Sequence, residues 1–454
     1  MKKSCLVLLL AVATAFGQPQ SSSLVNFAHL RHLTQEIVLN GQRVSIVHVY
    51  ANYPNYEWVE AADTGDEGMA CVDDGARAAV VYLRSYELLR DTSDLASARS
   101  LLRFVMSMEA DDGNFYNFVR SDASVNRDGK TSFKSFGWWA ARGVWAMSLG
   151  YRLTNDVDAQ FAGELKQCIE RSLPHVEQLI AQYGQTRTIA GFKLPTWLLY
   201  ESGSDATTEL VLGLIEFYQA TQDKRVKTYI EKLADGLMLM QDGDMRTFPF
   251  GAHRSWETMW HSWGNSQTHV LAYAGRMLRN KKMIASAEKE AKGFYARLLI
   301  EGMLKEWNFA ERQKKSVYEQ IAYGIRPMTL GLLRLYDATN NQVYLRMAGL
   351  AASWLFGNNV LHRSMYDSTT GRCFDGITDS TSLNRNSGAE SSIEALYTLL
   401  EIEQYPLARK YLTYKKKSSR STKETLSATF ENDAGDSVVL TMNLKRGTVL
   451  AQGQ

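Results

Sequence analysis

Residues 205–240 read DATTELVLGLIEFYQATQDKRVKTYIEKLADGLMLM. Within this stretch, Leu210–Tyr218 is apolar on nearly every side, which is typical of a helix that is buried all round. A short polar turn follows, and apolar residues then recur at helical spacing on one face: Val226, Ile230, Leu233 and Leu237. The stretch therefore predicts a hairpin that joins one buried helix to one half-exposed helix.

The same alternation extends over most of the chain. It predicts twelve helices, near 74–91, 94–109, 135–153, 156–183, 205–220, 224–240, 265–279, 281–301, 327–338, 341–356, 388–403 and 405–414. Pro174 is expected to kink or split the fourth helix, and Pro327 to begin the ninth. The buried members start 60 to 70 residues apart without a shared signature. This spacing indicates a degenerate repeat of helical hairpins. The number of hairpins is predicted to within one.

Long loops join the predicted hairpins and would all emerge at one end, beside the N-termini of the buried helices. They cover 110–134, 184–204, 241–264, 302–326 and 357–387. Loops of this length in a compact domain usually carry function. We therefore expect the functional site at that end of the helical domain.

The two ends of the chain differ from the helical body. Residues 24–60 and 427–442 are rich in β-forming residues, and the two segments are candidates to pair with each other. We expect four parts: a signal peptide at 1–17, a β-containing segment at 18–64, the helical domain at 65–414, and a linker with a β-hairpin at 415–454.

The N-terminus predicts export. Lys2 and Lys3 precede an apolar run that ends at Phe16, and Gly17 followed by Gln18 is typical of a cleavage site. The run is short for a membrane span, and no later segment is apolar over about 18 residues. The mature chain is therefore expected in the periplasm or outside the cell, with no membrane span; a retained N-terminal anchor is the alternative.

Charge and cysteine content exclude several classes of protein. The chain has 51 basic and 49 acidic residues, and the signal peptide carries two of the basic ones. A balanced mature chain does not fit a nucleic-acid-binding protein. After cleavage, Cys71, Cys168 and Cys373 remain; three thiols form no disulfide framework, and their spacing matches no zinc site. We expect buried structural thiols, and no pattern indicates an oligomeric state.

Three segments carry a resemblance to a known superfamily. They are Cys71–Ala78 (CVDDGARA), Gly371–Ile377 (GRCFDGI) and Asn384–Ser391 (NRNSGAES). With six consecutive hairpins, the chain resembles the six-hairpin glycosidase-like superfamily, over roughly residues 65–414. The resemblance implies a mainly α-helical (α/α)6 toroid and a carbohydrate substrate, an oligosaccharide or polysaccharide. Toroids of this kind also include lyases and sugar epimerases, so the resemblance does not fix the reaction.

Glycoside hydrolysis usually needs two carboxylates, one protonated and one ionised. The loop ends supply Asp73, Asp74, Glu201, Asp205, Asp242, Asp244, Glu257, Asp375 and Glu390. We prefer Asp74, from an adjacent like-charged pair before an apolar helix, and Glu201, which lies among aromatic residues. Asp73, Asp205, Glu257 and Glu390 are the reserves. Structural alternatives remain open: Asp74 and Asp205 as helix N-caps, 242–244 as a turn, and Glu390 as a first-turn carboxylate.

Aromatic residues in the same loops suit a sugar ligand. Candidate substrate-binding residues are Trp139, Trp197, Trp256, Trp260, Trp263, His253, Arg254, His261 and Tyr323. Trp138 and Trp139 open the second buried helix, and 253–263 is the densest cluster, with two His, one Arg, one Glu and three Trp. The structural alternative is that each indole fixes its loop to the helical body.

Other readings of these residues stay open. A polysaccharide lyase needs a base and a cation to hold a uronate, which His253, Arg254, His261, Tyr323 and Arg326 would supply. A sugar epimerase fits an exported protein less well, and a non-catalytic glycan-binding protein is the third alternative. The oxygen-bearing residues at 122–128 depart from the calcium-loop pattern, so we expect no metal and no cofactor.

Overall fold

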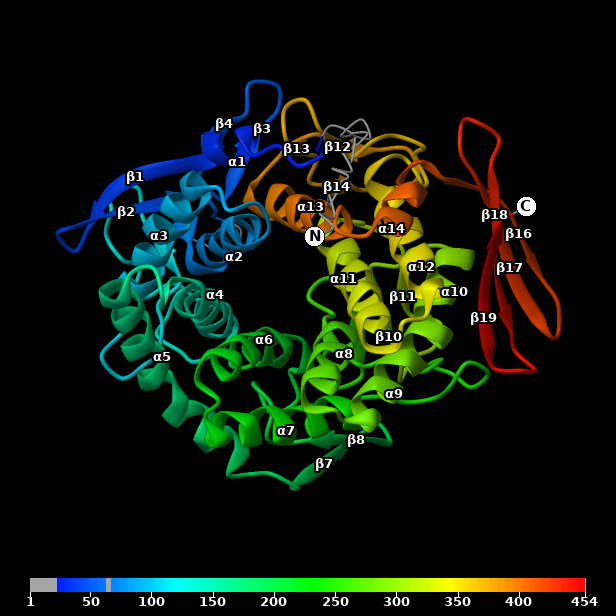
Figure 1. The fold of residues 1–454 in the computed structure, drawn as a ribbon, viewed down its shortest axis with the longest axis horizontal. Coiled ribbons are helices and arrows are strands. Elements are labelled where there is room, and N and C mark those ends of the chain that lie inside the picture. The colour runs from blue at the N-terminus through cyan, green and yellow to red at the C-terminus, as the bar shows by residue number, and fades with distance from the viewer. Residues whose placement is uncertain (1–22, 63–66, 454) are drawn as a thin grey trace, which may run out of the picture.

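The computed structural model describes residues 23–62 and 67–453, and its helices form a closed ring (Figure 1). In this part of the chain the inner layer consists of α2 (Val72–Leu89), α4 (Trp138–Thr154), α6 (Ser204–Thr221), α8 (Gln267–Leu278), α11 (Ala322–Thr339) and α13 (Ala389–Ile402). Each inner helix packs against the next, and α13 returns to α2. The predicted (α/α)6 toroid is confirmed.

The outer layer supplies the second helix of each hairpin. It consists of α3 (Thr92–Ser107), α5 (Ala159–Ile180), α7 (Lys224–Leu239), α9 (Lys281–Glu290) continued by the π-helix η1 (Ala291–Tyr295) and α10 (Ala296–Glu301), α12 (Gln342–Ala352) and α14 (Pro406–Lys410). These are the helices that the alternation of buried and half-exposed stretches predicts, with ends shifted by a few residues. The apolar stripe of each outer helix packs on its inner partner, which explains why the period alone located them.

Two proline-based expectations need correction: the helix start at Pro327, and the split that was one of two outcomes expected at Pro174. The helix predicted to start at Pro327 begins at Ala322, so this proline lies in its second turn. The split predicted at Pro174 does not occur, because α5 runs unbroken from Ala159 to Ile180. A proline inside a helix removes a single backbone hydrogen bond. Buried side chains on the same turns, such as Leu173 and Val176, hold the helix on the ring despite that loss.

The helix expected over 281–301 contains one irregular turn, η1. Gly293 lies in that turn against the backbone of Phe250, where a Cβ atom would come within 2.0 Å of the Phe250 carbonyl oxygen. The close approach of a loop backbone to this turn accounts for a glycine there.

The chain ends form two separate β structures. Near the N-terminus, α1 (Ala28–Leu33) is followed by the hairpins β1–β2 and β3–β4, with strands Thr34–Leu39, Gln42–Val47, Tyr50–Asn52 and Glu57–Val59. The C-terminal strands are β16 (Lys415–Ser421), β17 (Thr425–Glu431), β18 (Ser437–Asn443) and β19 (Thr448–Gly453). In the described residues these four pair in sequence order with one another and not with the N-terminal strands.

Two expectations about the C-terminal segment therefore need correction. The basic stretch expected to be a linker forms strand β16, and the sheet has four strands in place of a hairpin. Its alternate residues, including Leu426, Phe430 and Leu440, are buried, and the sheet packs on α10 and α12 at one side of the ring (Figure 1). That apolar face accounts for its position, because it covers the outer helices.

Short strands stiffen the long loops at the inner-helix N-termini. They are β5 (Ala70–Cys71), β6 (Phe118–Val119), β7 (Thr186–Ile189), β8 (Phe192–Pro195), β9 (Met259–His261), β10 (Glu306–Asn308), β11 (Lys315–Ser316), β12 (Tyr366–Asp367), β13 (Arg372–Cys373), β14 (Gly376–Ile377) and β15 (Leu383–Asn384). All pairings among them are antiparallel. The loops are thus ordered structures that hold their side chains in fixed positions.

A chain of buried charges links four inner helices across the ring. Arg77 of α2 donates to Glu394 of α13 at 3.1 Å, and Arg326 of α11 donates to the same carboxylate at 2.6 Å. Arg326 also reaches Glu209 of α6 at 3.4 Å. All four side chains are at least 95% buried. Charges this deep persist only when each has a partner.

The structure also bears on the expectations for the cysteines and for membrane-spanning segments. Cys71, Cys168 and Cys373 are free and buried, and burial raises the pKa of each thiol, as expected for structural cysteines. Among the described residues, none of the helices combines the length and the apolar character that a membrane span needs.

The buried charge chain leads to a prediction about stability. Arg326→Met should lower the free energy of unfolding by about 3–5 kcal/mol, because Glu209 and Glu394 lose a buried cationic partner. Urea denaturation followed by circular dichroism measures the change. Arg43→Met is the control: its ion pair with Glu36 is exposed and should contribute less than about 1 kcal/mol. Equal midpoints for the Arg326 variant and the unmodified protein would contradict the prediction.

Candidate functional site

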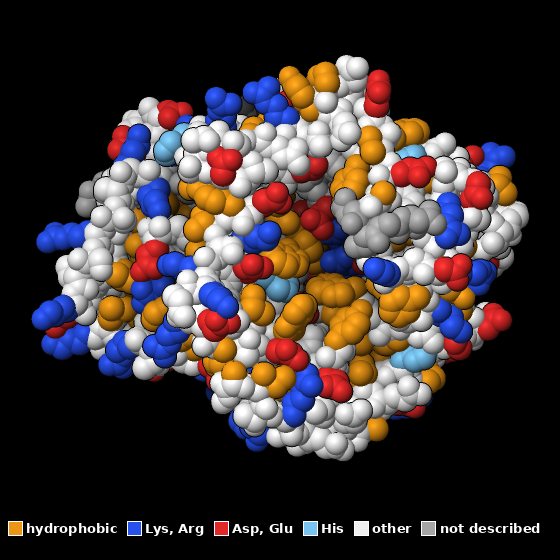
Figure 2. Space-filling model, turned by 180° about the vertical axis from the view of Figure 1, so that it is seen from behind, with side chains coloured by type: hydrophobic (Ala, Val, Ile, Leu, Met, Phe, Trp, Pro, Cys, Tyr) orange, Lys and Arg blue, Asp and Glu red, His pale blue; other side chains and the backbone are white. Residues whose placement is uncertain are grey.

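Two cavities lie at the N-terminal ends of the inner helices. The aromatic cavity has a volume of about 390 Å³ and is lined by Trp138, Tyr200, Ser202, Gly203, Asp205, Trp256 and Glu257. The charged cavity has a similar volume, and its lining includes Tyr323 and seven acidic or basic residues: Asp73, Asp74, Arg77, Arg142, Glu319, Asp375 and Glu390. One face of the molecule is hollowed near its middle, where hydrophobic, acidic and basic side chains meet (Figure 2).

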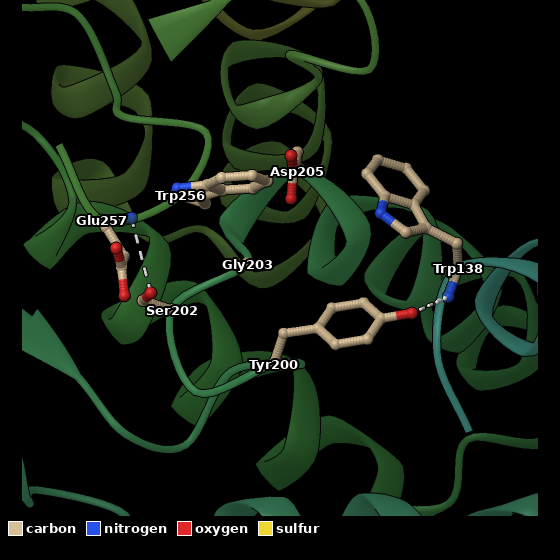
Figure 3. Close-up of a pocket in the computed structure, with 7 residues that line it drawn as sticks. All are labelled: Trp138, Tyr200, Ser202, Gly203, Asp205, Trp256 and Glu257. Atoms are coloured by element: carbon tan, nitrogen blue, oxygen red, sulfur yellow. Dashed lines mark hydrogen bonds between the residues drawn. The ribbon is translucent and has the colours of Figure 1, made fainter. Parts of the chain in front are cut away.

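The aromatic cavity is an open slot. The indoles of Trp256 and Trp138 lie on either side of Asp205, and Tyr200 extends from the loop before α6 towards Trp138 (Figure 3). Trp256 is 52% exposed and Tyr200 55% exposed, which is unusual for rings of this size. The Tyr200 hydroxyl accepts a hydrogen bond from the Trp138 backbone N–H at 3.0 Å, next to Gly137, where a Cβ atom would collide with the hydroxyl.

A buried histidine supports the acidic floor of this slot. His261 Nε2 lies 2.8 Å from Asp205 Oδ2, and His261 Nδ1 lies 2.6 Å from the carbonyl oxygen of Trp263. Because a carbonyl oxygen can only accept, Nδ1 carries a proton and donates it. The indole of Trp263 stacks on the imidazole at 3.9 Å, which fixes the ring. Asp205 is therefore held in one orientation between the exposed indole of Trp256 and the partly buried indole of Trp138.

An arginine joins the two rims of the slot. Arg187 of β7 forms ion pairs with Glu201 at 2.9 Å and with Glu257 at 3.0 Å. The side chain of Glu201 is 60% exposed, and Glu201 is not among the described residues that line either cavity. The preferred partner of Asp74 is thus a surface residue at the rim.

In the charged cavity, the two consecutive aspartates lie in different environments. Asp73 accepts from Arg142 at 2.6 Å and from the Asn117 amide at 3.1 Å, and its side chain remains partly exposed. Asp74 is buried: one oxygen accepts from Arg77 at 2.6 Å, and the other accepts from the Cys71 thiol at 3.3 Å. Burial raises the pKa of Asp74, although Arg77 opposes that change.

A third carboxylate completes the wall of this cavity. Asp375 Oδ1 accepts from the Gly388 backbone N–H at 2.8 Å and from the Ser391 hydroxyl. Burial raises the pKa of Asp375, and Glu390 and Glu319 add a smaller effect in the same direction. Since both hydrogen bonds use Oδ1, Oδ2 is the oxygen on which Asp375 can carry a proton.

The two cavities share one wall. Arg142 lies one turn after Trp138 on α4, and its guanidinium packs over the Trp138 indole at 4.9 Å. Arg142 also donates to the Tyr323 hydroxyl at 2.6 Å, and burial raises the pKa of that phenol. The two cavities therefore adjoin at the start of α4, where a residue that lines one packs on a residue that lines the other.

The structure brings together part of the predicted site. Asp73, Asp74, Glu390 and Tyr323 line the charged cavity, and Asp205, Glu257 and Trp256 line the aromatic cavity. Glu390 lies in the first turn of α13, as its structural alternative proposed, and pairs with Arg77 at 3.1 Å. Neither Asp74 nor Asp205 is the N-cap of its helix, because those positions are Cys71 and Gly203.

Several predicted aromatic residues lie away from both cavities. Trp197 donates its indole N–H to the Lys232 carbonyl, and Trp139 donates to the Phe115 carbonyl. Trp260 is buried against Phe294. These three side chains hold loops on the helical ring, as the structural alternative for the tryptophans proposed.

The basic residues of the 253–263 cluster are also enclosed. His253 contacts Glu290 and Ser286 at 2.8 Å and 2.9 Å and is fully buried. Arg254 pairs with Asp242 and donates to the Glu257 carbonyl at 2.7 Å. Asp244 accepts backbone N–H groups of residues 246 and 247, which matches the turn expected at 242–244.

Sequence reasoning missed several residues of the site. It does not single out Tyr200, Arg142 or Glu319, does not prefer Asp375, and favours Trp139 over its neighbour Trp138. One signal is available for Arg142: an arginine four residues after a tryptophan, with apolar or small residues on both sides of it in the helix, needs a buried partner. Trp138 and Trp139 carry no distinguishing signal, because only their direction from the helix separates them.

Comparisons with known proteins yield structural relatives. No family model matches the chain, and neither does any curated protein sequence. A sugar epimerase from a ruminal bacterium superposes with a TM-score of 0.59 and 12% identity over 85% of this chain and 97% of the other. Cellobiose 2-epimerase from Bacillus thermoamylovorans gives 0.57 and 14%, over 83% and 95%. An inactive α-1,6-mannanase variant from Salegentibacter, bound to α-1,6-mannotetrose, gives 0.50 and 12%, over 79% and 92%. These likenesses establish the fold.

Metal binding receives no support from the side-chain arrangement. Across residues 23–62 and 67–453, no group of three or more His, Cys, Asp or Glu side chains has a geometry that would hold a metal ion.

Proposed function

We propose that the protein is a glycoside hydrolase that acts on an oligosaccharide or polysaccharide. One observation carries the proposal: an open slot between two indoles adjoins a cavity in which an arginine-paired carboxylate and a carboxyl group of raised pKa share the wall. Glycoside hydrolysis uses such a pair, one ionised and one protonated.

The residues divide into roles by their contacts. Asp73 accepts from Arg142 and Asn117, which suits an ionised base or nucleophile. Asp375 keeps Oδ2 for a proton, which suits the general acid that protonates the leaving oxygen. Asp74 uses both of its oxygens inside the protein and orients Arg77, so we assign it a positioning role.

The aromatic cavity is the proposed binding site for a neighbouring sugar unit. The C–H face of a pyranose is apolar and packs on an indole, so Trp256 and Trp138 form suitable platforms. Asp205 lies between them, and its two oxygens already contact the Ala206 backbone N–H at 2.7 Å and His261 at 2.8 Å. A carboxylate oxygen has a second lone pair, which is the acceptor we assign to a sugar hydroxyl group. Because the two cavities share a wall, one saccharide chain can occupy both.

The structural relatives support a carbohydrate substrate. Two are named for sugar epimerisation, and the mannanase is bound to a mannose oligosaccharide. The mannanase is inactive as a variant in which two consecutive aspartates are replaced by alanine. This chain also has two consecutive aspartates, Asp73 and Asp74, at the start of α2. They support the proposal that this protein hydrolyses a glycosidic bond.

Product analysis tests the reaction class. The mature protein is incubated with neutral and uronate-containing oligosaccharides, and the products are examined by mass spectrometry. Fragments that gain one water per cleaved bond are expected. Unsaturated uronate ends would identify a lyase, and unchanged masses with altered retention times would identify an epimerase; either result would overturn the proposal.

Substitution of the two carboxylates tests the assigned roles. Asp73→Asn and Asp375→Asn should each lower kcat by about 10²–10⁴-fold, because each removes one partner in proton transfer or nucleophilic attack. Reducing-end release from an oligosaccharide measures the loss. Asp379→Asn is the matched control, an exposed aspartate on the same loop as Asp375, and should keep full activity.

The pH profile separates the acid from a residue with only a structural role. A carboxyl of raised pKa keeps its proton at a higher pH than an exposed aspartate, for which the pKa is about 4. The kcat/KM value should therefore fall as the pH rises through the pKa of Asp375. Asp375→Asn should remove this alkaline limb; an unchanged limb in that variant would contradict the assignment.

The aromatic slot gives a separate prediction. Trp256→Ala should weaken oligosaccharide binding about tenfold, or roughly 1.4 kcal/mol, because an exposed platform is lost. The melting temperature should stay the same, since the ring is half exposed. Trp58→Ala, which removes another half-exposed indole outside both cavities, is the control for a titration by calorimetry. Unchanged affinity after loss of Trp256 would exclude the slot as a sugar site.

We also propose that the protein is exported, although residues 1–17 lie outside the described residues. The support is the pair of lysines before the apolar run and the small residue before Gln18. Protein recovered from the periplasm or medium should begin at Gln18 on N-terminal sequencing. An N-terminus at Met1 in the cytoplasmic fraction would refute export.

A further inference from the structure

More carboxyl groups than guanidinium groups line the charged cavity, and this difference bears on which glycans the cavity accepts. Five carboxyl-bearing residues line it, namely Asp73, Asp74, Glu319, Asp375 and Glu390, against the two guanidiniums of Arg77 and Arg142. Resting on the proposed function, we infer that this cavity accepts only glycans that carry no carboxylate or sulfate at the unit bound there, and that Glu319 enforces this selection.

Arg77 is not available to an acidic sugar. Its Nη1 donates to Glu390 and Glu394, both at 3.1 Å, and its Nη2 donates to Asp74 at 2.6 Å. Its Nε donates to the backbone carbonyl of Asp73 at 3.3 Å. Every nitrogen of this guanidinium therefore already has an acceptor within the protein.

Arg142 offers little more. Its two terminal nitrogens donate to Asp73 and to the Tyr323 hydroxyl, both at 2.6 Å. Its buried Nε has no hydrogen-bond partner among the described residues. A neutral hydroxyl oxygen is enough to accept a hydrogen bond from this one N–H group. A sugar carboxylate would instead need a cation that is not yet paired, and Asp73 already forms an ion pair with Arg142.

The other buried arginines near the site are also occupied. Arg326 pairs with Glu394 and Glu209, and Arg254 pairs with Asp242. A uronate placed in the charged cavity would lose its hydration without gaining a free cationic partner, which is strongly unfavourable. Sugar hydroxyl groups, in contrast, are donors that the carboxylate oxygens can accept.

Glu319 is the carboxylate best placed to repel an acidic sugar. It is exposed, lines the charged cavity from the loop before α11, and raises the pKa of Asp375 through its negative charge. Unlike Asp73 and Asp74, it forms no ion pair with an arginine of this cavity. Its charge therefore acts on a ligand directly and makes it a determinant of specificity.

The test uses sugars that differ only at carbon 6. Cellotetraose and β-1,4-mannotetraose are compared with their C6-oxidised counterparts, the glucuronate and mannuronate tetramers. We expect kcat/KM for the neutral member of a pair to be at least about tenfold higher. Raising the salt concentration to about 1 M should narrow the difference, because salt screens repulsion between partly exposed charges.

Variants locate the effect. Glu319→Gln should reduce the discrimination several-fold. Discrimination is the ratio of kcat/KM for the neutral and the oxidised tetramer in the same variant, so a change in overall activity through Asp375 cancels. Glu231→Gln, on the outer helix α7, should leave the discrimination unchanged; its side chain is 44% exposed and remote from both cavities. Discrimination that is the same in the Glu319 variant and the unmodified protein would overturn the role of Glu319.

Equilibrium binding separates this inference from the proposed function. The same four tetramers are titrated against the unmodified protein by calorimetry. If none is cleaved but the neutral members bind more tightly, hydrolysis fails and the charge selection stands. Equal or tighter binding of the oxidised members, or binding of none of the four, overturns the selection.

Discussion

The ring depends on a set of charges that cannot be buried separately. Arg77, Glu394, Arg326 and Glu209 belong to four different inner helices, and each loses its water when the helices pack. A buried guanidinium or carboxylate without a partner is so costly that the helices are confined to the arrangement in which all four charges meet. Apolar packing would tolerate small shifts between neighbouring helices, but this network does not.

The same network extends into the proposed site. Arg77 donates to Glu394 in the core and to Asp74 and Glu390 at the cavity wall, so one side chain couples the packing of the ring to the geometry of the cavity. Rigid support of this kind is what a pair of carboxylates needs if each is to keep its own environment. The position of Asp73 follows in turn, because its partner Arg142 lies on the neighbouring inner helix α4.

Sequence periodicity predicted the fold because every helix meets the same physical requirement: it must bury an apolar face against its neighbours in the ring. It could not decide which of two adjacent residues faces a cavity. Trp138 lines the slot and Trp139 is buried against Phe115, although both open the same helix. The cluster at 253–263 divides into two groups. Trp256 and Glu257 line the aromatic cavity, whereas Arg254 donates to the Glu257 carbonyl and Glu290 accepts from both the backbone N–H and the imidazole of His253. A loop buried on the ring needs such polar contacts for its own backbone and charges. Glu290, the partner of His253, lies 37 residues further along the chain, whereas the partners of Arg254, Asp242 and Glu257, lie 12 and 3 residues away.

Because the ring closes between its first and last inner helices, the cavity cannot form until nearly the whole chain has been synthesised. The Arg77–Glu394 contact joins residues 317 positions apart, and the cavity wall is shared by the first and the last inner helix. At about 5–20 residues per second, a ribosome that has finished α2 needs tens of seconds more before α13 exists. During that interval Arg77 and Asp74 lack the residues of α13 that complete the cavity wall. A chain interrupted before α13 is thus without its cavity, and the site comes into being only when the whole ring has been made.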